Sequence, residues 1–486
     1  MCSAKVTEAS FMTIFLSALP VLSTILAMGL GARSFHAALL GVGSAVLAIV
    51  LAFPVPVEAI VPAALRWLPI MVEVLLIVAG GLLLSEVLHQ AGGQAALASW
   101  MRGRSGHSVS TILLVVHGVT PFAESLTGFG IGVTIGIPLL AHFGLSPGKV
   151  AVVGLLGLCA VPWGSMGPGT LIAASMSGVT FHDLGVASAI INIVPFVVTG
   201  VVAAWIASPV EQRASAVLQG ALSGVALTIA VAAMNMVFGT APAGALGALI
   251  VAVLHLIRAG RDGNAAALQG IGRKALSSYA VLLGGVLVAG WAVRLAGLSE
   301  NWRYVASPAL WLFVAAAWFD RGIPERQATL RAWKAWGQVA PLTSLFIALG
   351  ILMAMSGMAT FLAQALSSIG LAYLPIAPFV GAVGGFVTGS NTGANAMFAT
   401  TQAEIARSLG VDFLWFMAVH NVAAAFLLMA SPGKVEMAIQ LTGGGAAEQR
   451  RWIQATVLWV ALAVVGILAL VNTLVIGGYA ANLPLR

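Results

Sequence analysis

Charged side chains are scarce in this sequence. Only 8% of its 486 residues are Asp, Glu, Lys or Arg, whereas a soluble globular chain carries about 25%. Hydrophobic residues make up 60%, and so few charges cannot provide a water-facing surface around that much apolar mass. The composition therefore predicts a polytopic membrane protein. It excludes a soluble enzyme and a DNA-binding protein, so no nucleic-acid partner is expected.

Cysteine is almost absent as well. Cys2 and Cys159 are too few and too far apart for a disulfide framework or a metal site. The sequence also lacks a P-loop and an H-E-x-x-H motif, and without a nucleotide site ATP-driven pumping within this chain is not expected. We therefore expect no cofactor, no metal site and no catalytic residues.

Long runs without Asp, Glu, Lys or Arg predict the membrane-spanning helices, because a helix needs roughly 20 apolar residues to cross the bilayer core. One run is long enough for two spans with a turn near Pro242. The clearest runs lie at 9–32, 34–57, 184–210, 214–257, 275–293 and 304–319.

Two further runs carry polar and helix-breaking residues in their middle. Residues 105–148 contain a single charge, Glu124, within TPFAESLTGFG (120–130), and the run after Lys334 contains TGSNTGANAMF (388–398). Irregular backbone at membrane depth survives only where protein or a polar cavity surrounds it. The pattern predicts two re-entrant hairpins or broken helices, which in transporters form the binding site.

These two segments form an internal repeat. Residues 125–128 and 390–393 both read S-x-T-G. Each follows the end of a span, a Gly break and a short amphipathic segment, and each precedes an apolar helix with a Pro/Gly break. The upstream segments are 82–101 and 351–370, and the downstream breaks are VPWGSMGPGT (161–170) and MASPGKV (429–435).

Charge placement predicts the orientation of the two repeats. Lys and Arg are enriched in cytoplasmic loops. Arg102 and Arg104 follow the first amphipathic segment, whereas the second, at 357–372, has no basic residue. We therefore expect an inverted repeat, with both chain termini outside.

The repeat divides the chain into five expected parts. They are N-terminal helices at 1–67, the first transport repeat with its hairpin at 68–183, scaffold helices and a cytoplasmic linker at 184–335, the second transport repeat at 336–432, and a C-terminal linker and last helix at 433–486. The linker itself is the hydrophilic stretch 259–275. The predicted fold is all-α, with about 12 transmembrane helices plus two re-entrant hairpins, in an elevator-type transporter whose hairpin core slides against the scaffold.

Glu124 is the strongest candidate for a functional side chain. A carboxylate at membrane depth is costly and indicates function by default. We expect it to carry a coupled proton, and the alternative is a structural cap that accepts backbone N–H bonds at the hairpin tip. His420 and His117 are further candidates for proton coupling, because imidazole titrates in the useful range. Packing is the alternative for both.

The hairpin tips are the candidate substrate site. A helix N-terminus attracts anions through its dipole and its unpaired N–H groups, and the alternative is close packing through small residues. For Lys434 an interfacial anchor is favoured over a substrate contact. Glu73 is expected one turn in from the outer end of its span, and its role stays open. The residues expected to bind substrate are Ser125, Thr127, Gly128, Ser390, Asn391, Thr392, Gly393 and Asn395.

At these motifs the sequence resembles the lactate permease family, the bacterial symporters of lactate and glycolate. The similar segments are ESLTGFGIGVTIGIPLL (124–140), VPWGSMGPGT (161–170), TGSNTGANAMF (388–398) and SPGKVEMAI (431–439). The resemblance implies proton-coupled import of a small 2-hydroxymonocarboxylate (L-lactate, D-lactate or glycolate) through a bacterial cytoplasmic (inner) membrane. The implied partners are the organic anion, the proton and membrane lipids, and a homodimer stays open.

Two alternatives accompany this reading. The family lies near a wider superfamily of ion transporters with paired re-entrant hairpins, where Ser-Asn-Thr tips bind carboxylate and sodium. Ser390-Asn391-Thr392 matches such a tip, so the first alternative is a sodium-coupled symporter of a dicarboxylate or another organic anion. The second is a non-transporting membrane sensor or an intramembrane enzyme. It is disfavoured because the sequence shows neither a soluble signalling domain nor a recurring Ser/His or metal constellation.

Overall fold

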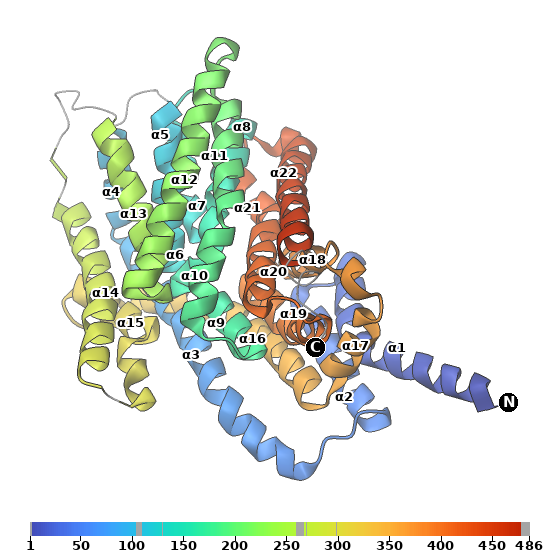
Figure 1. Cartoon of the computed structure of the whole chain (residues 1–486). Helices are drawn as coiled ribbons and strands as arrows, with labels where there is room; N and C mark the ends of the chain where they lie inside the picture. Colours follow the sequence, from blue (N-terminus) through green and yellow to red (C-terminus); the bar gives the residue numbers. More distant parts are fainter. Residues whose placement is uncertain are drawn as a thin grey trace.

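A computed structural model describes residues 2–103, 109–128, 130–258, 267–268, 270–297 and 299–477. This part of the chain is helical throughout (Figure 1), as expected where backbone groups must be paired without water. Within it, thirteen helical stretches are long and apolar enough to cross a membrane, which fits a multi-pass membrane protein. Arg104, most of the expected linker 259–275 and the end of the last expected part lie outside the described residues.

Most boundaries of the long helices fall where charges or helix breakers predict them. α12 and α13 meet at Gly239, which has a φ of +86°, close to the turn expected near Pro242. The long helices outside the hairpins are α1 (Cys2–Gly29), α2 (Ser34–Leu51), α3 (Val57–Gln90), α10 (Phe181–Ile191) with α11 (Ile193–Ala207), α12 (Arg213–Phe238), α13 (Thr240–Arg258), α14 (Gly270–Leu295), α16 (Arg326–Met355) and α22 (Arg450–Val471).

Two expectations about the spans need correction. The span expected at 304–319 is divided into a 3-10 turn, η4 (Glu300–Ala306), and a helix of 13 residues, α15 (Pro308–Asp320). The division follows from Pro308 at the start of α15, where the Ser307 hydroxyl caps the helix by accepting from the N–H of Ala309. Glu73, expected one turn from the outer end of its span, lies in the middle of α3 and accepts a 2.6 Å hydrogen bond from Ser307 Oγ.

The internal repeat is visible in the boundaries of the helices. α3 ends at Gln90, Gly92 takes a φ of +73°, and α4 (Gly93–Arg102) follows. In the second half α16 ends at Met355, Gly357 takes a φ of +79°, and α17 (Met358–Ser367) follows. Each of these boundaries recurs 265 positions later, which is also the separation of the two S-x-T-G motifs.

Each repeat then continues as a helix pair and an interrupted helix. The first pair is α5 (Val109–Leu113), the π-helix η1 (Leu114–Val119) and α6 (Thr120–Thr127), packed against α7 (Ile131–Leu140). The second is α18 (Ala377–Thr388) packed against α19 (Asn391–Leu409). The interrupted helices are α8 (Pro147–Leu156), η2 (Gly157–Met166) and α9 (Pro168–Ser177) in the first half, and α20 (Phe413–Leu427), η6 (Leu428–Ala430) and α21 (Pro432–Leu441) in the second.

The helices expected to form one scaffold at 184–335 pack in two different places. α13 contacts η1, α6 and η2 of the first repeat, and α12 packs along α11 and α13. α14 and α15 pack against each other, and α15 lies along α3 (Figure 1). One group of helices therefore supports the first hairpin directly, and the other supports the long helix that precedes it.

Candidate functional site

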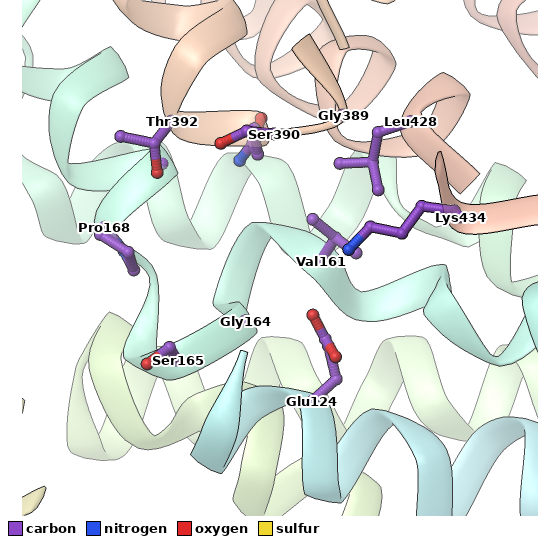
Figure 2. Close-up of a pocket in the computed structure, with 12 residues that line it drawn as sticks. Glu124, Val161, Gly164, Ser165, Pro168, Gly389, Ser390, Thr392, Leu428 and Lys434 are labelled. Carbon is purple, nitrogen blue, oxygen red and sulfur yellow. The ribbon is translucent and has the colours of Figure 1, made fainter. Parts of the chain in front are cut away.

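A cavity of about 60 Å³ lies where the two hairpin turns and the two helix breaks meet (Figure 2). Its lining is drawn from both repeats, so segments more than 200 positions apart in the sequence share one small polar space. The lining residues are Glu124, Val161, Gly164, Ser165, Pro168, Gly169, Gly389, Ser390, Asn391, Thr392, Leu428 and Lys434.

The Glu124 carboxylate holds the first hairpin turn. It is 3% exposed and lies in the last turn of α6. One oxygen accepts a hydrogen bond from the N–H of Gly130 at 2.9 Å, and the other accepts from the N–H of Gly132 at 3.0 Å. The carboxylate therefore caps the N-terminus of α7 and opposes its dipole. This is the capping role that the sequence left as the alternative for Glu124.

Lys434 lies opposite Glu124. Figure 2 shows its ammonium and the Glu124 carboxylate reaching toward one another across the cavity, and the two charges interact electrostatically. The side chain belongs to the first turn of α21, which begins at Pro432 after the break of the second repeat. Lys434 is thus a cavity residue, in contrast to the interfacial anchor that the sequence favoured.

The second hairpin turn directs a helix N-terminus at the cavity. α18 ends at Thr388, and Gly389 has a φ of +62°, in the left-handed region that favours glycine. Ser390 then caps α19, its Oγ accepting from the N–H of Gly393 at 3.3 Å. Asn391 and Thr392 form the first turn of α19 and line the cavity. First-turn N–H groups have no partner within their helix, so this end is suited to an anion.

The first S-x-T-G motif is placed differently from the second. α6 continues through Ser125 and Thr127, whereas Gly389 ends α18 before the second motif begins. Thr127 Oγ1 donates to the carbonyl of Ala123 at 2.6 Å, and Ser125 is buried against α13. The structure therefore does not bring Ser125, Thr127 or Gly128 to the cavity, because the same four residues end one helix and begin the other.

A buried amide network lies behind the second turn. Asn395 is fully buried, and its Nδ2 donates to Asn391 Oδ1 and to Asn421 Oδ1, both at 2.9 Å. Asn421 Nδ2 donates in turn to Thr170 Oγ1 at 3.1 Å and to Ser188 Oγ at 3.0 Å. Asn395 thus positions the tip against the break of the first repeat without lining the cavity.

The other expected residues also lie outside the cavity. Gly393 packs against Phe346 and Thr388. His420 is buried in α20 beside Gly381, and within the described residues neither ring nitrogen has a hydrogen-bond partner. His117 lies in η1, fully buried, and its ring nitrogens bond Ser223 and Thr199.

Ser165 is a cavity residue that the sequence did not single out. Its hydroxyl is buried and has no partner within the described part of the chain. Ser165 and Met166 have φ values of +46° and +64°, a left-handed conformation that is strained for residues with a Cβ and recurs at functional sites. The break at 161–170 indicated the region, but no sequence pattern shows which of its residues carries the strain.

Gly169 allows the second turn to pack on the first break. A Cβ on this residue would lie 2.5 Å from Asn391 Nδ2 and 2.9 Å from Asn391 Cβ, so a simple rotation of the amide cannot make room. We expect Gly169→Ala to destabilise the protein by about 1–3 kcal/mol and to lower its thermal unfolding midpoint in detergent. Gly433→Ala is the matched control, because no atom lies within 4 Å of a Cβ there. Equal midpoints for the two variants would show that the contact is easily relaxed.

Comparison with known proteins shows which proteins the chain is similar to. Residues 326–476 match the family model described as L-lactate permease. The chain is 38% identical to the L-lactate permease of Escherichia coli K12 over 88 residues, which are 18% of this chain and 16% of that protein. It is 33% identical to the glycolate permease of the same organism over 125 residues (25% and 22%). It is 24% identical to the L-lactate permease of Streptococcus iniae over 347 residues (64% and 73%).

The matches differ in how much of each protein they cover. The match to the E. coli L-lactate permease spans about a sixth of that protein's length, whereas the more distant match to the S. iniae protein spans most of it. The segment matched by the family model contains the second hairpin turn and Lys434. Together the matches show that the chain is similar to members of the lactate permease family.

Proposed function

We propose that this chain imports a small 2-hydroxymonocarboxylate, such as L-lactate, D-lactate or glycolate, together with a proton across a bacterial inner membrane. The observation that carries the proposal is the cavity in which the Lys434 ammonium and the N-terminus of α19 face the Glu124 carboxylate. The ammonium and the helix N-terminus attract an anion, and the carboxylate offers a place for a proton, so this small site fits an anion that enters with a proton.

The substrate carboxylate would bind between Lys434 and the first turn of α19. Both groups favour an anion, one by its charge and the other by its dipole and N–H groups. The Ser165 hydroxyl, buried at the cavity without a partner among the described residues, is suited to the 2-hydroxyl group. A volume of about 60 Å³ is far below the roughly 300–1,000 Å³ of a drug-sized pocket, so the site favours a ligand of few atoms.

The proton would bind to Glu124. The charge of Lys434 is balanced by the Glu124 carboxylate. A substrate anion beside that carboxylate would be repelled, and a proton on Glu124 removes the repulsion. Lys434 then interacts with the substrate carboxylate, so anion and proton bind together. This exchange of partners at Lys434 is the proposed basis of coupling.

Sodium coupling is the second candidate, with a dicarboxylate or another organic anion as substrate. It is favoured by Asn395 Oδ1, which is fully buried and has no hydrogen-bond partner among the described residues. Amide oxygens are suitable ligands for hard cations.

Uptake into proteoliposomes separates the two candidates. Labelled L-lactate, D-lactate, glycolate and succinate are supplied with an inward proton gradient or an inward sodium gradient, and protein-free liposomes measure passive entry of the undissociated acids. Accumulation of lactate or glycolate with the proton gradient alone is the expected result. Sodium-driven accumulation of succinate would establish the alternative.

For the architecture we propose an inverted repeat of two re-entrant hairpins in an elevator-type transporter. Helix boundaries that recur after 265 positions support the repeat. Basic residues follow the first amphipathic segment but are absent from the second, at 357–372, and this difference supports the inversion. We expect single cysteines at Gly103 and Ala365 to react with a membrane-impermeant reagent from opposite faces of the membrane. Labelling of both from one face would contradict the inversion.

A further inference from the structure

A continuous chain of side-chain hydrogen bonds runs through α5, α13, α12 and η1, apart from the cavity. Ser110 Oγ bonds His255 Nδ1 at 2.9 Å, and His255 Nε2 bonds Ser223 Oγ at 2.8 Å. Ser223 Oγ also bonds His117 Nδ1 at 2.8 Å, and His117 Nε2 bonds Thr199 Oγ1 at 3.2 Å. Two imidazoles are therefore joined through one hydroxyl.

The chain leads from a partly exposed imidazole to a fully buried one. His255 is half-buried in the last turn of α13. Ser223 is 5% exposed and His117 is 0% exposed. The buried end is closed by backbone, because a Cβ on Gly200 would collide with the carbonyl of Gly220 and with Cε1 of His117.

The donors in this chain point in one direction. Thr199 Oγ1 donates to the carbonyl of Pro195 at 2.8 Å, so its oxygen accepts the N–H of His117 Nε2. Neutral His117 then accepts at Nδ1 from the Ser223 hydroxyl. The oxygen of Ser223 accepts from His255 Nε2–H, and His255 Nδ1 accepts from Ser110. Such a head-to-tail order is what proton transfer along a chain requires.

The buried end of the chain lies on the same helical run as Glu124. His117 lies in η1, and α6, which carries Thr120 and Glu124, follows η1 directly along the chain. Thr120 Oγ1, between the two, is buried and has no partner within the described residues. His117 itself lies in a π-helix, a local form that is frequent at functional sites.

Few charges act on the two imidazoles. Among the described residues, the titratable and charged groups that act on them are the other imidazole and Arg258, one turn after His255 on α13. The thiol of Cys159, on η2, lies on the same side and contacts the carbonyl of Val116 at 3.8 Å. No carboxylate is among these groups, so the chain is not a set of ion pairs that stabilise one charge state.

We propose that Ser110, His255, Ser223 and His117 form a proton-transfer relay between the end of α13 and the region of Glu124. A proton that binds Ser110 Oγ lets the Ser110 hydroxyl proton pass to His255 Nδ1. The proton of His255 Nε2 then passes to Ser223 Oγ, and the Ser223 proton passes to His117 Nδ1. His117 is then an imidazolium, and His255 is neutral again. The reverse sequence releases the proton at Ser110 and restores the original bonds. The relay rests on the proposed proton coupling and supplies its route.

Ser223 is the residue to test, because its hydroxyl joins the two rings. In proteoliposomes containing a pH dye and clamped at zero membrane potential, we expect Ser223→Ala to slow lactate-coupled proton entry about tenfold or more. Exchange of labelled for unlabelled lactate at equal pH needs no net proton movement, so it should stay within about twofold of the unchanged protein. Ser223→Thr, which keeps the hydroxyl, should restore proton entry. Ser110→Ala should reproduce the defect from the other end of the chain.

Thr228→Ala is the matched control, because among the described residues this buried hydroxyl of α12 bonds only the carbonyl of Gly224 in its own helix. Thr228→Ala should change neither the rate of proton entry nor the rate of lactate exchange. Equal slowing of proton entry and exchange in Ser223→Ala would show that Ser223 only packs the helices, and unchanged proton entry would show that the proton takes another route. Either result overturns the relay while leaving proton coupling intact. Lactate transport without proton movement in the unchanged protein would overturn both.

Discussion

Glu124→Gln is expected to abolish the accumulation of lactate driven by a pH gradient while preserving exchange of labelled lactate. The amide is neutral like the protonated acid, so it leaves Lys434 to the substrate. It cannot bind and release a proton, so it transmits no driving force. With one proton per lactate, a gradient of one pH unit can sustain about tenfold accumulation, equivalent to about 1.4 kcal/mol. In the variant, the internal and external concentrations of lactate should remain nearly equal.

The control for this variant is Glu86→Gln. Glu86 is a partly exposed carboxylate of α3 that pairs with Arg331 at 3.5 Å, and its loss should leave accumulation unchanged. The measurement is the steady-state ratio of internal to external lactate. If Glu124→Gln still concentrates lactate with protons, Glu124 is only the cap of α7, and His117 or His420 becomes the proton carrier.

Lys434→Met should raise the dissociation constant for lactate about 100-fold. Removing one member of a desolvated charge pair typically costs about 2–5 kcal/mol, and here the substrate loses its ammonium partner while Glu124 keeps a charge that repels it. Binding of labelled lactate to purified protein measures the change. The double variant Glu124→Gln with Lys434→Met removes the uncompensated charge and should recover part of the affinity.

Lys149→Met is the matched control for Lys434→Met. Residues 146–150 and 431–435 both read SPGKV, and each lysine lies in the first turn of a helix that begins with proline. Lys149 is exposed and does not line the cavity, so its loss should leave binding unchanged. Normal lactate affinity in Lys434→Met would show that the cavity lysine does not bind the substrate.

The elements of this fold could largely be predicted from the sequence. Uncharged runs indicate spans because the bilayer excludes charge, and glycine breaks in equivalent places indicate a repeat. The shortness of α15 could not be predicted from charge spacing, because the helix starts at Pro308 and not at the last charge before it. The spacing of charged residues predicts which segments can lie in a membrane. The residue at which each helix begins depends on local capping.

The site was predicted only in part, and the reason lies in the backbone. Glu124, Ser390, Asn391 and Thr392 line the cavity as expected for a binding site between the hairpins. Ser125 shares its motif with Ser390 but lies within a helix that does not stop there. The SPGKV repeat likewise cannot distinguish Lys434 from Lys149, because only the three-dimensional packing of α21 brings one of them to the cavity. Identical short motifs thus have different environments.

The capping of α7 by Glu124 has a consequence for ligand valence. Helices α7, α9, α19 and α21 begin beside the cavity, and the N-terminus of α7 is capped by the Glu124 carboxylate of the protein itself. A ligand with one carboxylate can use the N-terminus of α19 together with Lys434. A ligand with two would have to direct its second negative charge at Glu124 or displace it from Gly130 and Gly132. In the proposed site, the Glu124 carboxylate would therefore favour monoanions over dianions.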